Sequence, residues 1–278
     1  MVKKIITILL SLLLVGGITY YNAAYVNCRT FSIREETLRS KKISKDLDGL
    51  LICCFSDLYY GDLTSDDYLR NVFETIDSFD PDIILFEGDL LYPGVEIPEE
   101  KRSTLIEMLS GMDARYGKYA VYGDQDHLGH EEVDEILSAS GFTVLNNANT
   151  LISVDRSGYI NLVGIDSLVS GEPDPTTAFS GSNTNYYTFA ISHCPDIFDS
   201  ASGYGVDLLS TGHSRGYQIY IPLISYFTRE YGYRKYVRGK NTKNGSTLDI
   251  NNGIGRYIND ARLFADAEIV LYTLRPLN

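Results

Sequence analysis

The hydrophobic positions in the first half of the folded region follow two alternating patterns. Continuous apolar runs of strand length cover 50–55, 83–86 and 119–122. Apolar residues at helical spacing, separated by polar ones, cover 66–79, 104–112 and 131–140. The first pattern is typical of strands covered on both faces, and the second predicts amphipathic helices. Because strands and helices alternate, this half predicts a largely parallel sheet built from βαβ units.

The pattern changes after residue 143, where strand-length runs follow one another without long helices between them. These runs cover 151–154, 160–165, 187–191, 208–210, 218–221, 247–250 and 269–274. We expect them to form a second, more antiparallel sheet that packs on the first. One domain over 46–278 accommodates both sheets.

An apolar segment precedes this α/β region. Lys3 and Lys4 are followed by the apolar stretch 5–18, which continues with mild polarity to Val26. This length approaches the roughly 20 residues that span a bilayer, and no A-x-A cleavage pattern follows. We predict that residues 1–26 are an uncleaved single-pass transmembrane anchor with the body outside the cytoplasm, and a cleaved signal peptide is the alternative. Residues 27–45 are polar and of mixed charge, and we expect a stalk there that has room for an edge strand.

Composition and charge narrow the class of protein. The 278 residues are 44% hydrophobic, which is ample for a large core, and the formal net charge is −13. Because a nucleic-acid backbone is captured by clustered Lys and Arg, this charge argues against broad nucleic-acid binding. An acidic protein that acts on phosphates needs bound cations or local arginines. The cysteines lack metal-type spacing, and we predict that they pack in the core rather than form disulfides: Cys28, Cys53, Cys54 and Cys194.

Six short polar motifs lie along the chain, most of them directly after a predicted strand. They are SDLY at 56–59, GDLLY at 88–92, GDQD at 123–126, SHCP at 192–195, GHSR at 212–215 and GYQI at 216–219. The carboxyl ends of strands in an α/β fold deliver side chains to a common crevice, so these motifs can meet in space. Each motif alone is weak evidence, and the specificity comes from the ordered set.

In this order the motifs resemble those of the calcineurin-like metallophosphoesterase family, which run D-x-H, G-D-x-x-D, G-N-H-D/E, S-H-x-P and G-H-x-H-G-G-Q. The resemblance covers about 46–277. It implies an α/β fold in which a two-sheet sandwich with αββα layers follows the transmembrane helix. The layout of anchor, stalk and single domain is similar to the membrane-associated branch related to UDP-2,3-diacylglucosamine pyrophosphatases.

The resemblance implies two metal sites, of which the second keeps its character. Its ligands would be Asp89 as the bridging carboxylate, Asp124 in place of an asparagine, His193 and His213. Two imidazoles and two carboxylates suit Zn, Mn or Fe as the divalent ion. An aspartate in place of asparagine adds negative charge, which strengthens binding of a dication. We therefore expect one bound ion at this site.

The first metal site implied by the resemblance has lost ligands. Asp57 and Asp89 remain, but Tyr59 and Arg215 stand where the family has histidines. A guanidinium stays protonated and does not ligate a metal. Two carboxylates roughly 4 Å apart repel by about 4 kcal/mol at an effective dielectric of about 20. The hypothesis is that Arg215 occupies the first-metal position and pairs with Asp57 or Asp89.

A competing interpretation keeps the first metal. Purple acid phosphatases, in the same superfamily, use G-D-x-x-Y, whose tyrosinate binds ferric iron, and Gly88, Asp89 and Tyr92 reproduce that spacing. Asp57, Asp89 and Tyr92 would then give three ligands. Those enzymes also keep the histidine that is Arg215 in this chain, which weighs against this alternative.

The third departure from the family concerns proton transfer. Gln125 stands where the family has a histidine beside the substrate, and a glutamine donates a hydrogen bond but not a proton. The next residue, Asp126, follows the family pattern, in which the acid orients that histidine. His127 and His130 lie nearby in a polar turn, where a histidine is usually solvated.

These observations predict a membrane-anchored, metal-dependent phosphoesterase with a modified, mononuclear site. It would hydrolyse phosphomonoester, phosphodiester or pyrophosphate bonds, and Arg215 would bind a phosphate oxygen or neutralise the carboxylates. The alternative is a catalytically inactive relative that holds a phosphorylated ligand or a partner protein. The expected substrate is a phosphorylated small molecule or a lipid-like one, and a basic aromatic stretch over 226–238 is a candidate lid for it.

Overall fold

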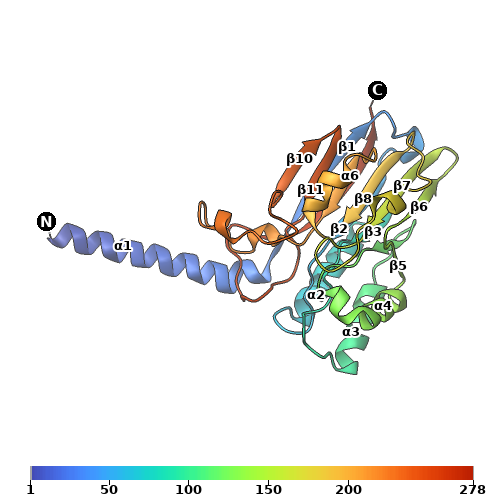
Figure 1. Cartoon of the computed structure of the whole chain (residues 1–278). Coiled ribbons are helices and arrows are strands. Elements are labelled where there is room, and N and C mark those ends of the chain that lie inside the picture. The colour runs from blue at the N-terminus through green and yellow to red at the C-terminus, as the bar shows by residue number, and fades with distance from the viewer. Residues whose placement is uncertain (1, 278) are drawn as a thin grey trace.

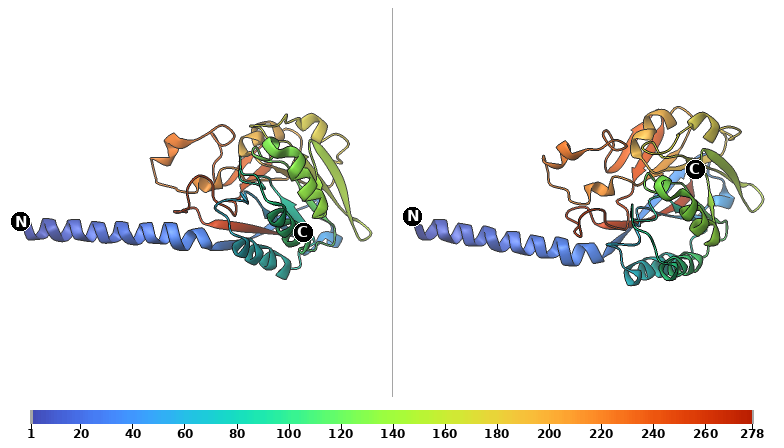
Figure 2. Two further views of the ribbon diagram at one scale, coloured as in Figure 1. Left: turned by 90° about the horizontal axis from the view of Figure 1, so that it is seen from below. Right: turned by 60° about the horizontal axis from the view of Figure 1, so that its bottom comes forward.

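Residues 2–277 are described by a computed structural model, in which twelve strands form two stacked six-stranded sheets. The N-terminal helix α1 (Val2–Tyr21) extends away from the body that these sheets form (Figure 1). The two further views show the same separation of helix and body (Figure 2). The polar motifs therefore lie in the body that the sheets form, and α1 is separate from them.

The first sheet has a parallel centre, as the alternation of strands and helices predicts. Its order is β1 (Phe31–Ser40), β12 (Ala267–Pro276), β2 (Leu51–Phe55), β3 (Ile83–Phe86), β4 (Lys118–Ala120) and β5 (Phe142–Val144). Strands β2 to β5 pair in parallel, while β12 is antiparallel to β2 and parallel to β1. The connections between the parallel strands carry α2 (Asp66–Ser78), α3 (Glu99–Ser110) and α4 (His130–Ala139).

The second sheet is mixed and, as expected, more antiparallel than the first, since two of its five strand pairs are antiparallel and only one of five is in the first sheet. Its order is β10 (Gly239–Lys243), β11 (Ser246–Ile250), β9 (Leu208–Thr211), β8 (Tyr187–Ser192), β7 (Gly158–Ile165) and β6 (Ala148–Val154). The three inner pairs are parallel, and only the outer strands β6 and β10 pair antiparallel. Long loops with the short helices α5 (Pro175–Ala178) and α6 (Phe198–Ala201) make the crossovers that parallel strands need.

Two expectations about the strands differ from the structure. The last strand, β12, belongs to the first sheet rather than the second. Residues 218–221, predicted as a strand, form a loop, because Tyr217 and Gln218 have φ values of 76° and 57° in the left-handed region. Strands β1, β5 and β10 did not stand out as apolar runs, since β5 has three residues and β10 is polar.

Three hydrophobic clusters hold the layers together. One lies between the two sheets and includes Ile52, Leu85 and Phe189. A second packs α2, α3 and α4 against the outer face of the first sheet, and a third packs α5 and α6 against the second sheet. The four cysteines are buried and free, as predicted.

The N-terminal region is a continuous helix followed by a strand. The helical residues Val2–Arg29 are long and apolar enough to cross a membrane, by length and composition, and end in a π-helical turn and a 3-10 turn. The helix is a signal sequence or a single anchor. Within 27–45, where a stalk is expected, Phe31–Ser40 forms the edge strand β1, which pairs with β12 over its whole length. The folded body therefore starts before residue 46.

Candidate metal centre

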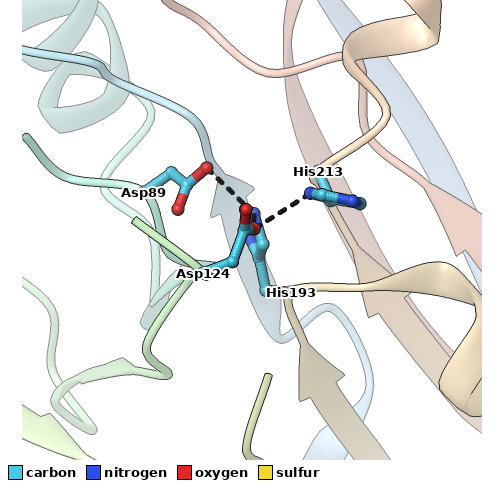
Figure 3. A group of neighbouring side chains, drawn as sticks. All are labelled: Asp89, Asp124, His193 and His213. Atoms are coloured by element: carbon cyan, nitrogen blue, oxygen red, sulfur yellow. Dashed lines mark ion pairs between the residues drawn. The ribbon is translucent and has the colours of Figure 1, made fainter. Parts of the chain in front are cut away.

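Four buried side chains from the two sheets converge at the carboxyl ends of their strands. Asp89 follows β3, Asp124 follows β4, His193 follows β8 and His213 follows β9. Each offers one ligand atom, and these atoms lie within 4.8 Å of one another. Figure 3 shows the four side chains pointing toward one another. The structure thus brings together the four residues expected at the second metal site.

The backbone at these strand ends adopts conformations that ordinary residues avoid. Asp57, Asp89 and His213 have φ values of 54°, 61° and 63°, in the left-handed region. Such conformations cost of order 1–3 kcal/mol each and persist where the surroundings enforce them. Gly123 has no room for a side chain, because a Cβ there would collide with the Asp89 carboxylate. The motif glycine is therefore needed for the close approach of the Asp89 and Asp124 loops.

Hydrogen bonds to the backbone orient both imidazoles. His193 Nδ1 lies 2.7 Å from the Glu87 carbonyl oxygen, and His213 Nε2 lies 3.2 Å from that of Tyr231. A carbonyl only accepts, so each of these nitrogens carries the proton and donates it. The other nitrogen of each ring then turns its lone pair toward the carboxylates. Such carbonyl contacts are the usual partners of metal-ligating histidines.

The inner face of the cluster is a group of acceptors without donors. Asp124 Oδ1 lies 2.9 Å from His193 Nε2 and 3.0 Å from His213 Nδ1, and Asp89 Oδ2 lies 3.1 Å from His193 Nε2. Asp124 Oδ1, His193 Nε2 and His213 Nδ1 are buried without a hydrogen-bond partner. Acceptors packed against one another in a buried site require a cation. The donor set of two nitrogens and two oxygens fits Zn, Mn or Fe.

The charges in the cluster also favour a bound cation. Burial lowers the pKa of His193, but the Asp89 and Asp124 carboxylates raise it well above its ordinary value. Burial raises the pKa of Asp124, but the neighbouring imidazoles of His193 and His213 bring it well below its usual range. The cluster therefore attracts positive charge, either as protons on the imidazoles or as a metal ion.

A second buried cluster lies beside the first and is centred on the hydroxyl of Tyr59. Tyr59 Oη donates to Asp89 Oδ2 at 2.6 Å and lies 3.2 Å from Asp57 Oδ1. Arg215 Nη1 donates to the same hydroxyl at 2.6 Å and lies 3.8 Å from Asp57 Oδ1. The hydroxyl of Tyr59 thus joins the guanidinium to Asp89, while Arg215 faces Asp57 directly.

Protonation states suit this arrangement. Burial raises the pKa of Tyr59 well above its ordinary value, so the phenol stays neutral and can donate. Burial lowers the pKa of Arg215, but the neighbouring Tyr59 and Asp57 oxygens raise it beyond its ordinary value. The guanidinium also lies over the rings of Tyr59 and Tyr257, at 5.5 and 5.0 Å from their centroids. The site therefore holds a permanent cation beside the two carboxylates.

The remaining predicted site residues surround these clusters. Gln125 donates from its side chain to Asp124 Oδ2 at 2.8 Å and from its backbone to Asp89 Oδ1 at 2.9 Å. Asp126 accepts the backbone N–H groups of Asp89, Leu90 and Gly123, at 2.7–2.8 Å, and so fixes both loops. The half-buried ring of Tyr92 packs against Tyr59 and Tyr257 at centroid distances of 6.4 and 5.7 Å.

The two histidines near Gln125 point elsewhere. His127 Nε2 lies 2.8 Å from Asp166 Oδ1, on the loop after β7. His130 is exposed and packs on Tyr122 at a centroid distance of 4.5 Å. Neither contact involves the four-residue cluster, so neither histidine takes the place of the one that Gln125 replaces.

Sequence reasoning missed three contributors to the site. Tyr59 was noted only as a residue that stands where the family has a histidine, and its contacts were not predicted. Tyr257 lies in a loop far from any motif. Glu87 is fully buried directly before the GDLLY motif, with both carboxylate oxygens unpaired, and burial raises its pKa to about 8. A charged residue that ends an apolar run was the available signal for Glu87.

A cavity of about 240 Å³ opens beside the Arg215 cluster. Its lining includes Arg215, Tyr233 and Tyr257, together with Thr228 and Ile258. Polar and aromatic groups therefore surround the space next to the guanidinium. A phosphorylated group in this cavity would face Arg215.

Comparisons with known proteins place this site in a wider context. No protein-family model matches the chain. The chain is 29% identical over 270 residues to the uncharacterized metallophosphoesterase YkuE of Bacillus subtilis, an alignment that covers 95% of this chain and 93% of that protein. It is 28% identical over 222 residues to the UDP-2,3-diacylglucosamine pyrophosphatase LpxG of Chlamydia trachomatis, covering 63% and 66% respectively. The solved structure of the sulfate thiohydrolase SoxB of Thermus thermophilus aligns with a TM-score of 0.51 at 12% identity, over 81% of this chain and 56% of that one.

The comparisons and the geometry agree. At this low identity the SoxB alignment concerns the fold alone, and it matches the two mixed sheets. The alignment with YkuE covers nearly the whole chain, and the ordered motifs contribute the residues of the buried Asp and His cluster. In sequence and in fold the chain is therefore similar to the calcineurin-like metallophosphoesterases.

Proposed function

We propose that this protein is a metal-dependent phosphoesterase that holds one divalent ion. The ligands are Asp89, Asp124, His193 and His213. The observation that carries the proposal is the group of buried, unpaired acceptor atoms at the centre of the cluster. Because both imidazoles donate to backbone carbonyls, their free lone pairs favour a metal ion over a hydrogen-bonded network.

The residues around the ion have distinct roles in this proposal. When bound, a divalent ion supplies Lewis-acid polarisation of a phosphoryl oxygen and lowers the pKa of water. Arg215 binds a second phosphoryl oxygen or neutralises Asp57, and it does so without a second ion. Gln125 keeps Asp124 in place by its hydrogen bond. Asp126 holds the backbone of both carboxylate loops.

The proposal extends to location and substrate. We take the N-terminal helix as a retained single-pass anchor with the body outside the cytoplasm. Its exposed apolar surface and its length support this assignment. The substrate class is a phosphorylated small molecule or a lipid-like phosphate ester, and similarity to the pyrophosphatase LpxG supports the second.

A second candidate function is a catalytically inactive binding protein. Gln125 stands where a histidine would transfer a proton, and Tyr59 and Arg215 fill the first-metal position. In that case the single ion and Arg215 would hold a phosphorylated ligand without turnover. The two functions share the metal site and differ in whether a bond is cleaved.

The test combines metal content with turnover. The purified full chain is stripped with a chelator, reloaded with Mn, Zn or Fe, and assayed on p-nitrophenyl phosphate and bis-p-nitrophenyl phosphate. We expect one ion per chain and metal-dependent hydrolysis, both lost in His213→Ala. His130→Ala is the matched control, because His130 is an exposed histidine outside the cluster, and it should retain both.

The other outcomes separate the alternatives. One tightly bound ion without hydrolysis would support the binding protein. Two ions per chain would contradict the assignment of Arg215 to the first-metal position. A purple or red colour on loading with iron, lost in Tyr92→Phe, would instead support the tyrosinate site.

A further inference from the structure

The loop that follows the last motif carries large apolar side chains on its outside. Leu223 and Phe227 are 85% and 84% exposed, and the exposed residues beside them are also apolar or aromatic: Ile221, Ile224 and Tyr226. Leu223 adopts a φ of 70°, in the left-handed region, so a strained residue presents its side chain outward. A soluble surface rarely gathers such residues in one short segment, and such patches mark interaction sites.

A second loop presents similar side chains beside the first. Ile258 and Phe264 are exposed and also have positive φ, of 64° and 54°. Gln218 joins the two loops, since its side chain donates to the carbonyls of Asn259 and Ala261 and accepts from the Tyr257 N–H. Tyr220 and Leu263 add a backbone hydrogen bond of 2.8 Å. The two loops are therefore one unit, which we call the apolar rim: residues 219–228 and 257–264.

The apolar rim is fastened to the base of the N-terminal helix. The Arg262 N–H donates to the Ala23 carbonyl at 3.0 Å, and Asn27 Nδ2 donates to the Arg262 carbonyl at 3.3 Å. Arg256 donates to the Cys28 carbonyl. In Figures 1 and 2 the orange loop of the rim lies on the side of the body from which α1 leaves, and it reaches along the helix. A bilayer that contains α1 would meet the rim.

Charge and aromatic groups around the rim fit a lipid headgroup layer. Arg229 and Arg238 lie over the rings of Tyr226 and Tyr220, at 4.4 and 4.7 Å from the ring centroids. Their hydrogen bonds go to the Tyr217 hydroxyl and to the carbonyls of Arg234 and Phe264 rather than to carboxylates. In a chain with a net charge of −13, these cations remain available to anionic headgroups. Tyrosine and arginine are the residues that favour the membrane interface.

We propose that the apolar rim inserts into the interface of an anionic bilayer beside the anchor helix. This inference rests on the proposed retained anchor, and the occupant of the rim is the lipid bilayer. The 240 Å³ cavity that ends at Arg215 is lined by Thr228 and Ile258, one from each loop. Insertion therefore brings this cavity to the lipid surface and gives an amphiphilic phosphate ester a path from the membrane to Arg215.

The experiment uses the absence of tryptophan from the chain. Phe227→Trp places the single tryptophan on the first loop and Ile258→Trp places it on the second. Leu151→Trp on the distant strand β6 is the matched exposed control. Each full-length variant is reconstituted into phosphatidylcholine and phosphatidylglycerol vesicles with or without brominated acyl chains. We expect a blue-shifted emission and quenching by brominated lipid at 227 and 258, and neither effect at 151.

Two results would overturn the proposal in different ways. Retention of the chain in carbonate-washed vesicles with unquenched tryptophan at 227 and 258 would overturn the rim and leave the anchor standing, which would favour a protein partner for this surface. Release of the chain by carbonate would overturn the anchor and, with it, the rim. Metal content and turnover on a soluble phosphodiester, measured on the same samples, report the proposed hydrolase independently of either result.

Discussion

At the scale of single residues, Tyr59 connects the charged groups of the site. Its neutral hydroxyl accepts from Arg215 and donates to Asp89, so one oxygen links a buried cation to a buried carboxylate. Removing it leaves both charged groups short of a partner in a largely buried site. A buried group that loses its partner costs about 1–3 kcal/mol, and more when it is charged.

We therefore predict that Tyr59→Phe lowers the free energy of unfolding by about 1–3 kcal/mol. Urea unfolding of the metal-free protein measures the change. Tyr92→Phe is the control, because its ring packs on the same two tyrosines without a charged partner, and it should stay within about 0.5 kcal/mol of wild type. An unchanged Tyr59→Phe variant would mean that the hydroxyl does not hold the two charges together.

The pair of His127 and Asp166 predicts a pH dependence of stability. The hydrogen bond that His127 donates to Asp166 raises the pKa of His127, although burial lowers it. Burial raises the pKa of Asp166, but its bond with His127 brings it below the ordinary value. The histidine contribution is complete below its unfolded pKa of about 6.5 and is lost as the pH rises through the folded pKa. The aspartate contribution is lost as the pH falls below about 4.

Accordingly, wild type should exceed His127→Gln in stability most strongly near pH 5–6, and the advantage should shrink by pH 8–9. Urea midpoints across this range measure the difference. His130→Gln provides the control and should show no such trend, because His130 is exposed and its nearest ring is that of Tyr122. An advantage that grows toward high pH would contradict the ion pair.

At the scale of elements, the edge strand β1 belongs to the fold through Arg34. This residue contacts Asp249 of β11 at 2.8 Å and Glu268 of β12 at 3.2 Å, so one side chain on β1 joins the two sheets. Asp249 is fully buried. The strand therefore connects the N-terminal helix rigidly to the sandwich instead of leaving it on a flexible tether.

Arg34→Ala should destabilise the fold by about 2–4 kcal/mol, because it leaves the buried Asp249 carboxylate without its guanidinium partner. This figure allows for the partial exposure of the Arg34 guanidinium, which weakens the ion pair. Arg39→Ala on the same strand should cost less than about 0.5 kcal/mol, since Arg39 is exposed. Urea unfolding of both variants gives the comparison. Equal effects would show that β1 is held by its backbone pairing alone.

The elements also show what the sequence can and cannot predict. Helix α2 and strands β2 and β3 follow the predicted patterns closely, because their apolar periodicity reflects burial directly. Strand β10 was missed, since an edge strand needs no apolar run, and 218–221 was assigned wrongly because apolar residues there point outward from a loop. Parallel pairing in the second sheet was hidden by crossovers that consist mainly of loop.

At the scale of the whole molecule, part of the site could be predicted from the sequence and part could not. The convergence of Asp89, Asp124, His193 and His213 was predictable, because each lies just after a strand and strand ends share one edge. The contacts of Tyr59 with Arg215, and the position of Tyr257 over the guanidinium, were not predictable. They depend on how loops from distant parts of the chain fold over the edge, and no local pattern records that.

The metal cluster joins the two sheets, so metal binding should stabilise the whole fold. Asp89 and Asp124 come from the first sheet, while His193 and His213 come from the second. An ion that binds only the folded chain adds about 2.7 kcal/mol at a concentration one hundred times its Kd. For a chain of this size about 1 kcal/mol shifts the Tm by about 2–4 °C, so loading should raise the Tm by roughly 5–11 °C.

Differential scanning calorimetry of the chelator-treated and the metal-loaded protein tests this linkage. His213→Ala removes one nitrogen ligand on the second sheet, so its Tm should respond little to the metal, while His130→Ala should keep the full rise. The size of the rise should also grow with the logarithm of metal concentration, which a nonspecific salt effect on this acidic surface would not reproduce at constant ionic strength. A full rise in His213→Ala would place the stabilising ion elsewhere and separate the fold's stability from the cluster.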